Sequence, residues 1–321
     1  MKHVAPPCKK TLVCLFVLLL SAVSPLLSCR AERGLTAAAS RVGSEAAAPL
    51  ICLVAGCDEA GGHTDALFLC SLDSAAQTLT VVQIPRDTYL AFGGYQNKIN
   101  QLYPHLLAKT PAKNDKKAAL LSLRRTLSDV LGLPIDGAIL LRLSDVSAAV
   151  DALGGVPVDL PRDVVFVGDD GRRVTHRAGH SLLDGRAALA FLRHRGTYAT
   201  GDLGRLDAQK IFLSAAFARL RTADSRRLLS LVATLGGRAV IDADRDTISR
   251  VTALARRRPT LSVAYVTLPG TPVLSRGDSG LSYYVVCRAG ADRLLSDLLP
   301  RSGPIDPARR LTSPSLPVVD E

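Results

Sequence analysis

Short apolar runs and stretches of helical periodicity alternate along most of the chain. The runs Leu50–Gly56, Asp65–Asp73 and Leu79–Pro85 are rich in branched apolar residues and end at glycine, proline or charged positions. Runs of this length with such boundaries are typical of buried strands. Because the second and third runs are separated only by a polar turn, we expect them to form a hairpin.

Helical spacing is clearest after the third run. The apolar positions Leu120, Leu123, Leu127 and Val130 recur every three or four residues, which predicts an amphipathic helix. Asn114 and Asp115 precede it as predicted N-caps, and Ser144 is predicted to cap the following helix, which ends at Gly154–Gly155. Further strands are expected at 137–143, 156–161 and 261–270, a hairpin at 164–176, and helices on both sides of the loop near residue 197 and at 225–235, 246–257 and 291–299.

This alternation lacks internal repeats and predicts an α/β or α+β fold, with α/β taken first, in which helices cover a central mixed sheet. No clean break interrupts it, so we expect a single domain over residues 50–300. Residues 30–49 are rich in Ala, Ser and Gly and are predicted to be a linker. The Pro- and Ser-rich residues 301–321 are predicted to be a disordered tail.

The N-terminus carries Lys2, Lys9 and Lys10 before an uncharged apolar stretch at 11–29. A positive segment before an apolar run is the pattern of exported proteins. The first interpretation is an uncleaved signal anchor with its positive end inside, which makes a single-pass membrane protein. A lipoprotein signal with Cys29 lipidated and a removed signal peptide are the alternatives. In each case residues 1–29 are a targeting segment and the domain is extracytoplasmic.

Composition narrows the choice of partner. The net charge of +11 favours an anionic partner, but aromatic residues make up only 4% and tryptophan is absent. Nucleic acid is therefore disfavoured, because bases stack on aromatic side chains. The seven cysteines form no CxxC pair, which argues against a zinc site. Cys52 and Cys70 are predicted to be core residues, and a disulfide between them stays open.

Two groups of charged residues follow the predicted strands. Asp58 and Asp65 flank a Gly/His loop between the first two strands. Carboxylates in such positions can share Mg²⁺, or they can cap the turn. Arg86 and Asp87 follow the third strand, where binding crevices form in open sheets. A surface ion pair is the alternative, and Lys98 after a Gly–Gly loop is a weaker candidate.

The stretch 191–210 reads FLRHRGTYATGDLGRLDAQK. Arg193 and Arg195 precede a Gly/Thr loop, and Asp202, Arg205 and Gln209 follow it at helical spacing. Arginine forks match phosphate oxygens, so two arms around a loop suit a pyrophosphate. A solvated basic surface is the alternative. The chain has no Walker A, GxSxG, HExxH or strand-linked GxGxxG motif.

Taken in order, these motifs resemble the LytR-CpsA-Psr family of cell-wall glycopolymer transferases. The matching series comprises G-x-D at Gly56–Asp58, Thr64–Asp65, IPRD at Ile84–Asp87, KIN at Lys98–Asn100, LGGVPVDLP at Leu153–Pro161, LDG at Leu183–Gly185, R-x-R at Arg193–Arg195, D-x-G-R at Asp202–Arg205, Gln209, TLPG at Thr267–Gly270 and SYYV at Ser282–Val285. The resemblance implies an α–β–α sandwich with an apolar pocket for a polyprenyl chain.

It also implies a phosphotransferase. Such an enzyme moves a teichoic acid or capsule-like glycopolymer from an undecaprenyl-pyrophosphate carrier to a peptidoglycan acceptor. By matching positions, Asp58 and Asp65 would hold Mg²⁺ (or Mn²⁺). The residues that would line the pyrophosphate are Arg86, Arg193, Arg195, Arg205 and Gln209, with Lys98 nearby. Asp87 and Asp202 are the candidate general bases.

Three departures from the family pattern bear on this expectation. Ala60 and Ala208 stand where the family often has arginine, and Gln83 stands where it has serine. A thinner arginine cluster leaves two alternatives to the transferase. One is a non-catalytic protein that binds polyprenyl phosphate or wall polymer, and the other is a lipid pyrophosphate hydrolase.

Overall fold

A mixed six-stranded sheet forms the centre of the protein, as the sequence predicts. The computed structural model describes residues 48–59, 62–167, 173–193, 202–256, 260–274 and 282–298. In spatial order the strands are β11 (Val240–Asp242), β6 (Gly137–Arg142), β1 (Leu50–Cys57), β2 (Thr64–Asp73), β3 (Thr78–Ile84) and β12 (Ser262–Thr267). The predicted hairpin is confirmed, because β1, β2 and β3 pair antiparallel in sequence order.

The two outer pairings join segments far apart in the sequence. β6 runs parallel to β1, with Cys57 opposite Arg142, and β12 runs parallel to β3, with Thr267 opposite Gln83. The carboxyl ends of β1, β3, β6 and β12 therefore lie at one edge of the sheet. In open sheets this edge is where binding crevices form.

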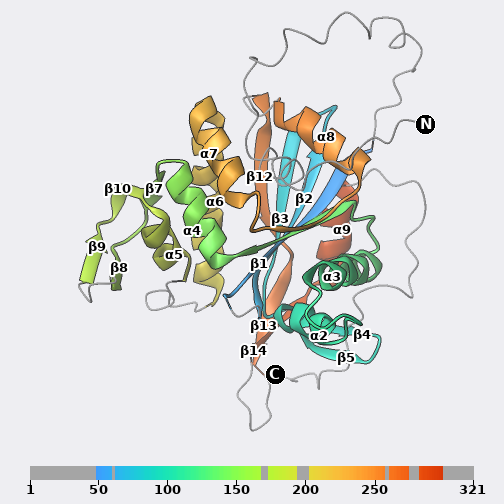
Figure 1. The fold of residues 1–321 in the computed structure, drawn as a ribbon. Coiled ribbons are helices and arrows are strands. Elements are labelled where there is room, and N and C mark those ends of the chain that lie inside the picture. The colour runs from blue at the N-terminus through green and yellow to red at the C-terminus, as the bar shows by residue number, and fades with distance from the viewer. Residues whose placement is uncertain are drawn as a thin grey trace, which may run out of the picture.

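Helices cover both faces, as Figure 1 shows. Because side chains alternate along a strand, Ile51 and Leu53 pack on one face and Leu50 and Cys52 on the other. The first face is covered by α2 (Leu102–Ala108), α3 (Lys116–Leu131) and α9 (Arg288–Leu298). The second is covered by α4 (Leu143–Ala152), α6 (Asp202–Thr222), α7 (Ser225–Leu235) and α8 (Arg245–Arg256).

A smaller cluster lies beside the second face. Helix α5 (Gly185–Arg193) packs against α6 and two small antiparallel sheets through buried residues that include Phe191, Ala208 and Phe212. One sheet pairs β7 (Val156–Leu160) with β10 (Gly179–Leu183), and the other is the hairpin of β8 (Val164–Val167) and β9 (Arg173–His176) that connects them in sequence. This cluster fixes α5 beside α6, the helices that flank the arginine-rich loop.

The caps of two helices test the sequence signals differently. Asp115 caps α3 as predicted, because its Oδ1 accepts from the backbone of Lys117 and Ala118 at 3.0 Å. The prediction for Ser144 is wrong, because α4 begins one residue earlier, at Leu143. Asp145 in the first turn accepts from the Arg142 backbone N–H at 2.8 Å instead, and the Ser144 hydroxyl donates to Glu59.

Two hairpins escaped the sequence reasoning. β4 (Tyr89–Phe92) and β5 (Tyr95–Lys98) join through Gly93 and Gly94, and β13 (Gly270–Leu274) pairs with β14 (Ser282–Val286). Among the described residues, no helix is both long enough and apolar enough to cross a bilayer. The predicted targeting segment at 11–29 lies outside the described residues.

Candidate functional site

The hairpin of β1 and β2 brings Asp58 and Asp65 to the same edge of the sheet. Cys57 lies opposite Thr64, with an irregularity in the register beside Gly56. Asp58 follows β1 directly and closes the loop, because its Oδ1 accepts from the Gly62 backbone N–H at 2.7 Å. Asp65 is the second residue of β2. The register thus places both residues at the same end of the β1–β2 hairpin.

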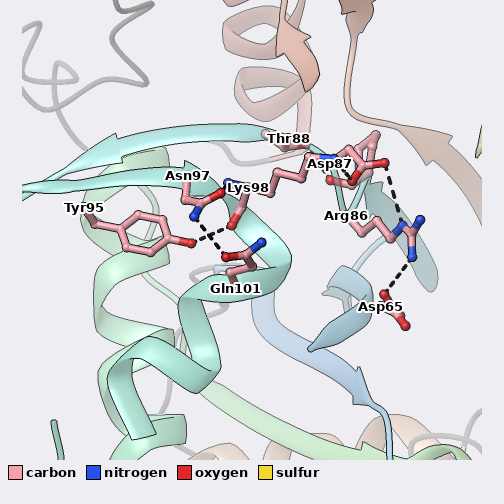
Figure 2. A network of polar contacts seen from close by, with 9 residues as sticks. Asp65, Arg86, Asp87, Thr88, Tyr95, Asn97, Lys98 and Gln101 are labelled. Atoms are coloured by element: carbon pink, nitrogen blue, oxygen red, sulfur yellow. Dashed lines mark hydrogen bonds and ion pairs between the residues drawn. The ribbon is translucent and has the colours of Figure 1, made fainter. Parts of the chain in front are cut away.

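Arg86 reaches this edge from the third strand. Pro85 follows β3 directly, and β3 pairs with β2 through Leu67 and Ile84. The Arg86 Nη1 donates to Asp65 Oδ1 at 3.0 Å, and the Arg86 side chain is only 16% exposed. Figure 2 shows the guanidinium between Asp65 and Asp87. An arginine that is mostly buried between two carboxylates has a fixed position and a fixed charge.

Charges alternate from Asp65 through Arg86 and Asp87 to Lys98. The Arg86 Nε lies 3.7 Å from Asp87 Oδ2, and the Lys98 Nζ lies 2.9 Å from Asp87 Oδ1. Asp87 and Lys98 are 15% and 16% exposed. Lys98 ends β5, whose position is held by a bond from the Tyr95 hydroxyl to the Lys98 carbonyl at 2.6 Å (Figure 2). Lys98, the weakest candidate from sequence, is thus part of the same ion-pair chain as Arg86.

Backbone hydrogen bonds hold the Arg86–Asp87 loop from three directions. Asn100 N–H donates to the Arg86 carbonyl at 3.2 Å, and Tyr284 N–H donates to the Asp87 carbonyl at 2.8 Å. The Thr88 N–H and hydroxyl both donate to the Pro85 carbonyl. A loop with this many bonds presents its side chains from a preorganised backbone, which suits charge stabilisation.

Two tyrosines beside the loop were missed as site residues. Tyr89 and Tyr283 contact edge to face with ring centroids 5.4 Å apart, and the Lys98 Nζ lies 5.5 Å from the Tyr283 ring centroid. The sequence held Tyr283 only within the SYYV motif. The two tyrosines are brought together by the parallel bridge between Thr88 and Tyr284. No local sequence pattern encodes this long-range contact, so sequence reasoning had no signal for the pair.

Gln209 joins the site through an unpredicted partner. The Gln83 Nε2 donates to Gln209 Oε1 at 2.5 Å, and both side chains are buried. Gln83 belongs to β3, two residues before Pro85, so this bond attaches α6 to the strand that carries Arg86. Gln83, noted from sequence only as a departure, therefore supplies the contact that places Gln209.

The remaining residues that were expected to line the pyrophosphate are only partly described by the structure. Arg193 ends α5 and is exposed, whereas Arg195 lies outside the described residues. Asp202 begins α6 and Arg205 follows in its first turn, but their side chains lie outside the described part of the chain. Ala60 also falls outside it, whereas Ala208 is fully buried.

An apolar cavity of about 240 Å³ lies between the sheet and helices α4, α6 and α7. Gly56 and Ala66 line its wall, directly beside the strand ends that carry Asp58 and Asp65. Among its described lining residues, one is charged. The fully buried carboxylate of Asp145 pairs with Arg142 at 3.4 Å and Arg238 at 3.6 Å. This buried carboxylate was not predicted, because Asp145 has the sequence context of an ordinary first-turn residue.

The donor chemistry at the two strand ends fits a hard cation. Among the described residues, no three His, Cys, Asp or Glu side chains gather as a complete metal-binding group. Mg²⁺ does not need one, because it keeps several waters and binds through one or two carboxylates plus phosphate oxygens. The buried Asn100 Oδ1 also has no hydrogen-bond partner within the described chain. The Asn100 backbone is held at this edge, because its carbonyl accepts from the Thr64 hydroxyl and its N–H donates to the Arg86 carbonyl. The Asn100 Oδ1 is thus an additional acceptor near the strand ends.

A cysteine close to Asp58 is unsuited to nucleophilic chemistry. Burial, together with the neighbouring Asp58 carboxylate, raises the pKa of the Cys57 thiol to about 11. A thiol with a raised pKa holds little thiolate at neutral pH, and the thiolate is the reactive form. The chemistry of this edge therefore belongs to its carboxylates and cations.

Comparison with known proteins points to one family. The model of the LytR_cpsA_psr family matches residues 30–298. The chain is 29% identical over 170 residues to polyisoprenyl-teichoic acid–peptidoglycan teichoic acid transferase TagV of Bacillus subtilis, a match that covers 51% of this chain and 40% of TagV. It is 27% identical over 252 residues to a TagU of the same description from Oceanobacillus iheyensis, covering 77% of this chain and 74% of that relative.

The fold agrees with these relatives. The crystal structure of B. subtilis TagV superposes with a TM-score of 0.62 at 22% identity, over 79% of this chain and 98% of the TagV chain. A likeness at this identity concerns the fold alone. The part of the chain that aligns with the TagV sequence spans well under half of that relative's length.

Proposed function

We propose that this chain, which belongs to the LytR-CpsA-Psr family, transfers a glycopolymer from a polyprenyl-pyrophosphate carrier to peptidoglycan. TagV and TagU are described as teichoic acid transferases of this kind, and teichoic acid is the corresponding substrate class here. An undecaprenyl carrier is the donor that the family resemblance implies. The transfer would take place outside the cytoplasm, with residues 11–29 as a single-pass anchor or Cys29 as a lipidated terminus.

One observation carries this proposal: the apolar cavity and the charged edge share a wall. Gly56 and Ala66 line the cavity. Asp58 lies two residues after Gly56, and Asp65 lies one residue before Ala66. A polyprenyl pyrophosphate has the same division, with an apolar chain attached to a doubly anionic head. The cavity would take part of the chain and leave the pyrophosphate beside Arg86.

The cations of the edge suit the charged head. Arg86 and Lys98 lie on either side of Asp87 and are mostly buried, so their charges act in an environment with little water. Arg193, Arg195 and Arg205 would add further charge from α5 and α6. Asp58 and Asp65 would hold Mg²⁺, which would supply positive charge to the pyrophosphate oxygens.

In the proposed reaction, a peptidoglycan hydroxyl oxygen attacks the phosphorus that carries the glycopolymer. A new P–O bond forms as the bond to the second phosphate breaks, and polyprenyl monophosphate leaves. Asp87 is one candidate acceptor for the hydroxyl proton, because its carboxylate lies at the charged edge beside Arg86. Asp202 is the other candidate. Phosphoryl transfer depends mainly on positioning and charge stabilisation, which this edge supplies without a covalent intermediate.

The test replaces the most firmly placed cation. We expect Arg86→Ala to abolish transfer of a lipid-linked glycan to peptidoglycan, and Arg86→Lys to restore it only partly, because lysine lacks the bidentate fork. Arg125→Ala, on the exposed face of α3, is the matched control and should keep full activity. Full transfer by Arg86→Ala protein with an unchanged circular dichroism spectrum would exclude the proposed role.

The same assay separates the two alternatives. A wild-type protein that binds the lipid but never releases polyprenyl monophosphate would be a binding protein. Release of phosphate without an acceptor would identify a pyrophosphate hydrolase. Both outcomes are measured on the same reaction mixture, by following the lipid and the polymer separately.

A further inference from the structure

Helix α7 has two faces with different chemistry. Leu228, Leu231 and Leu235 are buried, and the last two line the apolar cavity. On the opposite face Arg226 is exposed, and Leu229 is 54% exposed. The helix is therefore a thin wall, with the cavity on its inner side and arginine and leucine on its outer side.

Positive charge gathers on the outer side of this wall. Arg221 is exposed at the end of α6, and Arg226 and Arg227 lie in the first turn of α7. Asp224 caps α7, because its carboxylate accepts from the Arg227 N–H at 2.9 Å. Its other oxygen lies 3.5 Å from the Arg227 guanidinium. The exposed Arg221 and Arg226 and the half-buried Arg227 thus give this face a concentration of basic side chains.

A second exposed leucine lies near Arg227. The Arg227 guanidinium lies against Gly154, and Leu182 packs over the adjacent Gly155. Leu182 is 60% exposed. Arginine side chains around exposed leucines form the combination that binds at the boundary between lipid head groups and acyl chains.

The N-terminal part of the chain joins the fold at this end of the protein. The Ala48 carbonyl accepts from the Arg250 guanidinium of α8 at 2.5 Å. Leu50 then packs in one cluster with Leu228 of α7 and Leu254 of α8. Figure 1 shows α7 and α8 toward the same end of the molecule, away from the β13–β14 hairpin beside the charged edge. The described chain therefore begins, at residue 48, at the end of the fold that carries α7 and α8.

We propose that this outer face, formed by Arg221, Arg226, Arg227, Leu182 and Leu229, docks on an anionic lipid bilayer. The arginines attract the head groups, and the leucines enter the boundary of the acyl chains. Docking places the α7 wall of the cavity against the membrane, so the apolar cavity lies close to the acyl chains. The docking rests on the surface alone and does not require the transferase activity.

The absence of tryptophan from the chain allows a direct test. Leu229→Trp gives the full-length protein a single tryptophan on the proposed face. The protein is reconstituted in vesicles of phosphatidylglycerol or phosphatidylcholine that carry bromine on their acyl chains. We expect the tryptophan to lose most of its emission and shift to shorter wavelength in phosphatidylglycerol, with little change in phosphatidylcholine.

Two controls make the result specific. Phe92→Trp places the probe at a side chain that is 42% exposed on the β4–β5 hairpin, next to the charged edge, and should stay unquenched in both lipids. Arg221→Glu with Arg226→Glu should abolish quenching of Trp at position 229, whereas Arg125→Glu on α3 should leave it intact. Absence of quenching in phosphatidylglycerol, equal quenching in both lipids, or quenching that survives the double reversal would each overturn the proposal. Because the readout is fluorescence, its failure is distinct from loss of transferase activity.

Discussion

At the scale of single residues, two departures from the family pattern are explained by packing. Ala208 is fully buried in the cluster that contains Phe191 and Phe212. An arginine would have to bury its charge there, which is costly without a partner. Gln83, in place of serine, is long enough to reach Gln209 across the space between β3 and α6. The two departures therefore belong to one local arrangement of α6 against the sheet.

The Gln83–Gln209 bond should be worth measuring by a double-mutant cycle. We expect Gln83→Leu alone to lower the free energy of unfolding by about 1–3 kcal/mol, because it leaves the buried Gln209 amide without its partner. Gln83→Leu combined with Gln209→Leu should cost less than the sum of the two single changes. Urea unfolding of the four proteins gives the comparison. Strict additivity would contradict a direct coupling between the two amides.

At the scale of elements, the sequence was most informative where apolar periodicity is strong. The strands at Leu50 and Thr78, and helix α3, follow from alternation, helical spacing and caps. The β4–β5 hairpin was missed because YLAFGGYQNK lacks a clean alternation. Its Gly93 and Gly94 have φ of +53° and +82°. Two glycines of this kind between strands are a type I′ hairpin signal that could have found it.

The LDG motif shows what an element requires of one residue. A Cβ added to Gly185 at the start of α5 would lie 2.3 Å from the Ser147 carbonyl oxygen of α4. We expect Gly185→Ala to lower the free energy of unfolding by about 1–3 kcal/mol, because two helix backbones would have to separate. Gly237→Ala is the control, since nothing lies within 4 Å of its added Cβ. Equal urea midpoints for the two variants would show that α5 and α4 can move apart freely.

At the scale of the whole molecule, the pairing of distant strands was beyond sequence reasoning. The parallel pairs β1–β6 and β3–β12 bring the strand ends to one edge, and the cavity lies beneath that edge. Local periodicity identifies strands but does not state which of them become neighbours. The resemblance to a known family led us to expect a pocket. Leu50 and Cys52 point to one face of the sheet, and Ile51 and Leu53 point to the other. The pocket lies on the face of Leu50 and Cys52.

The cavity gives a prediction about carrier length. Ala216→Phe would fill part of the apolar space between α6 and the sheet. We expect KM to rise for a long polyprenyl donor and to stay nearly unchanged for a short-chain analogue, because only the long chain uses the cavity. Ala112→Phe at an exposed loop position serves as control. Equal KM changes for long and short donors would show that the carrier chain binds elsewhere.

The hydrogen bond from Tyr284 to the Asp87 carbonyl also has a consequence for biosynthesis. Arg86 leaves the ribosome long before Tyr284, so the loop that carries it gains its last backbone bond only when nearly the whole fold has been made. The parallel pair β3–β12 imposes the same delay, and distant pairings of this kind fold slowly. During synthesis, the charged edge therefore stays incomplete until the last described strand, β14, has been made.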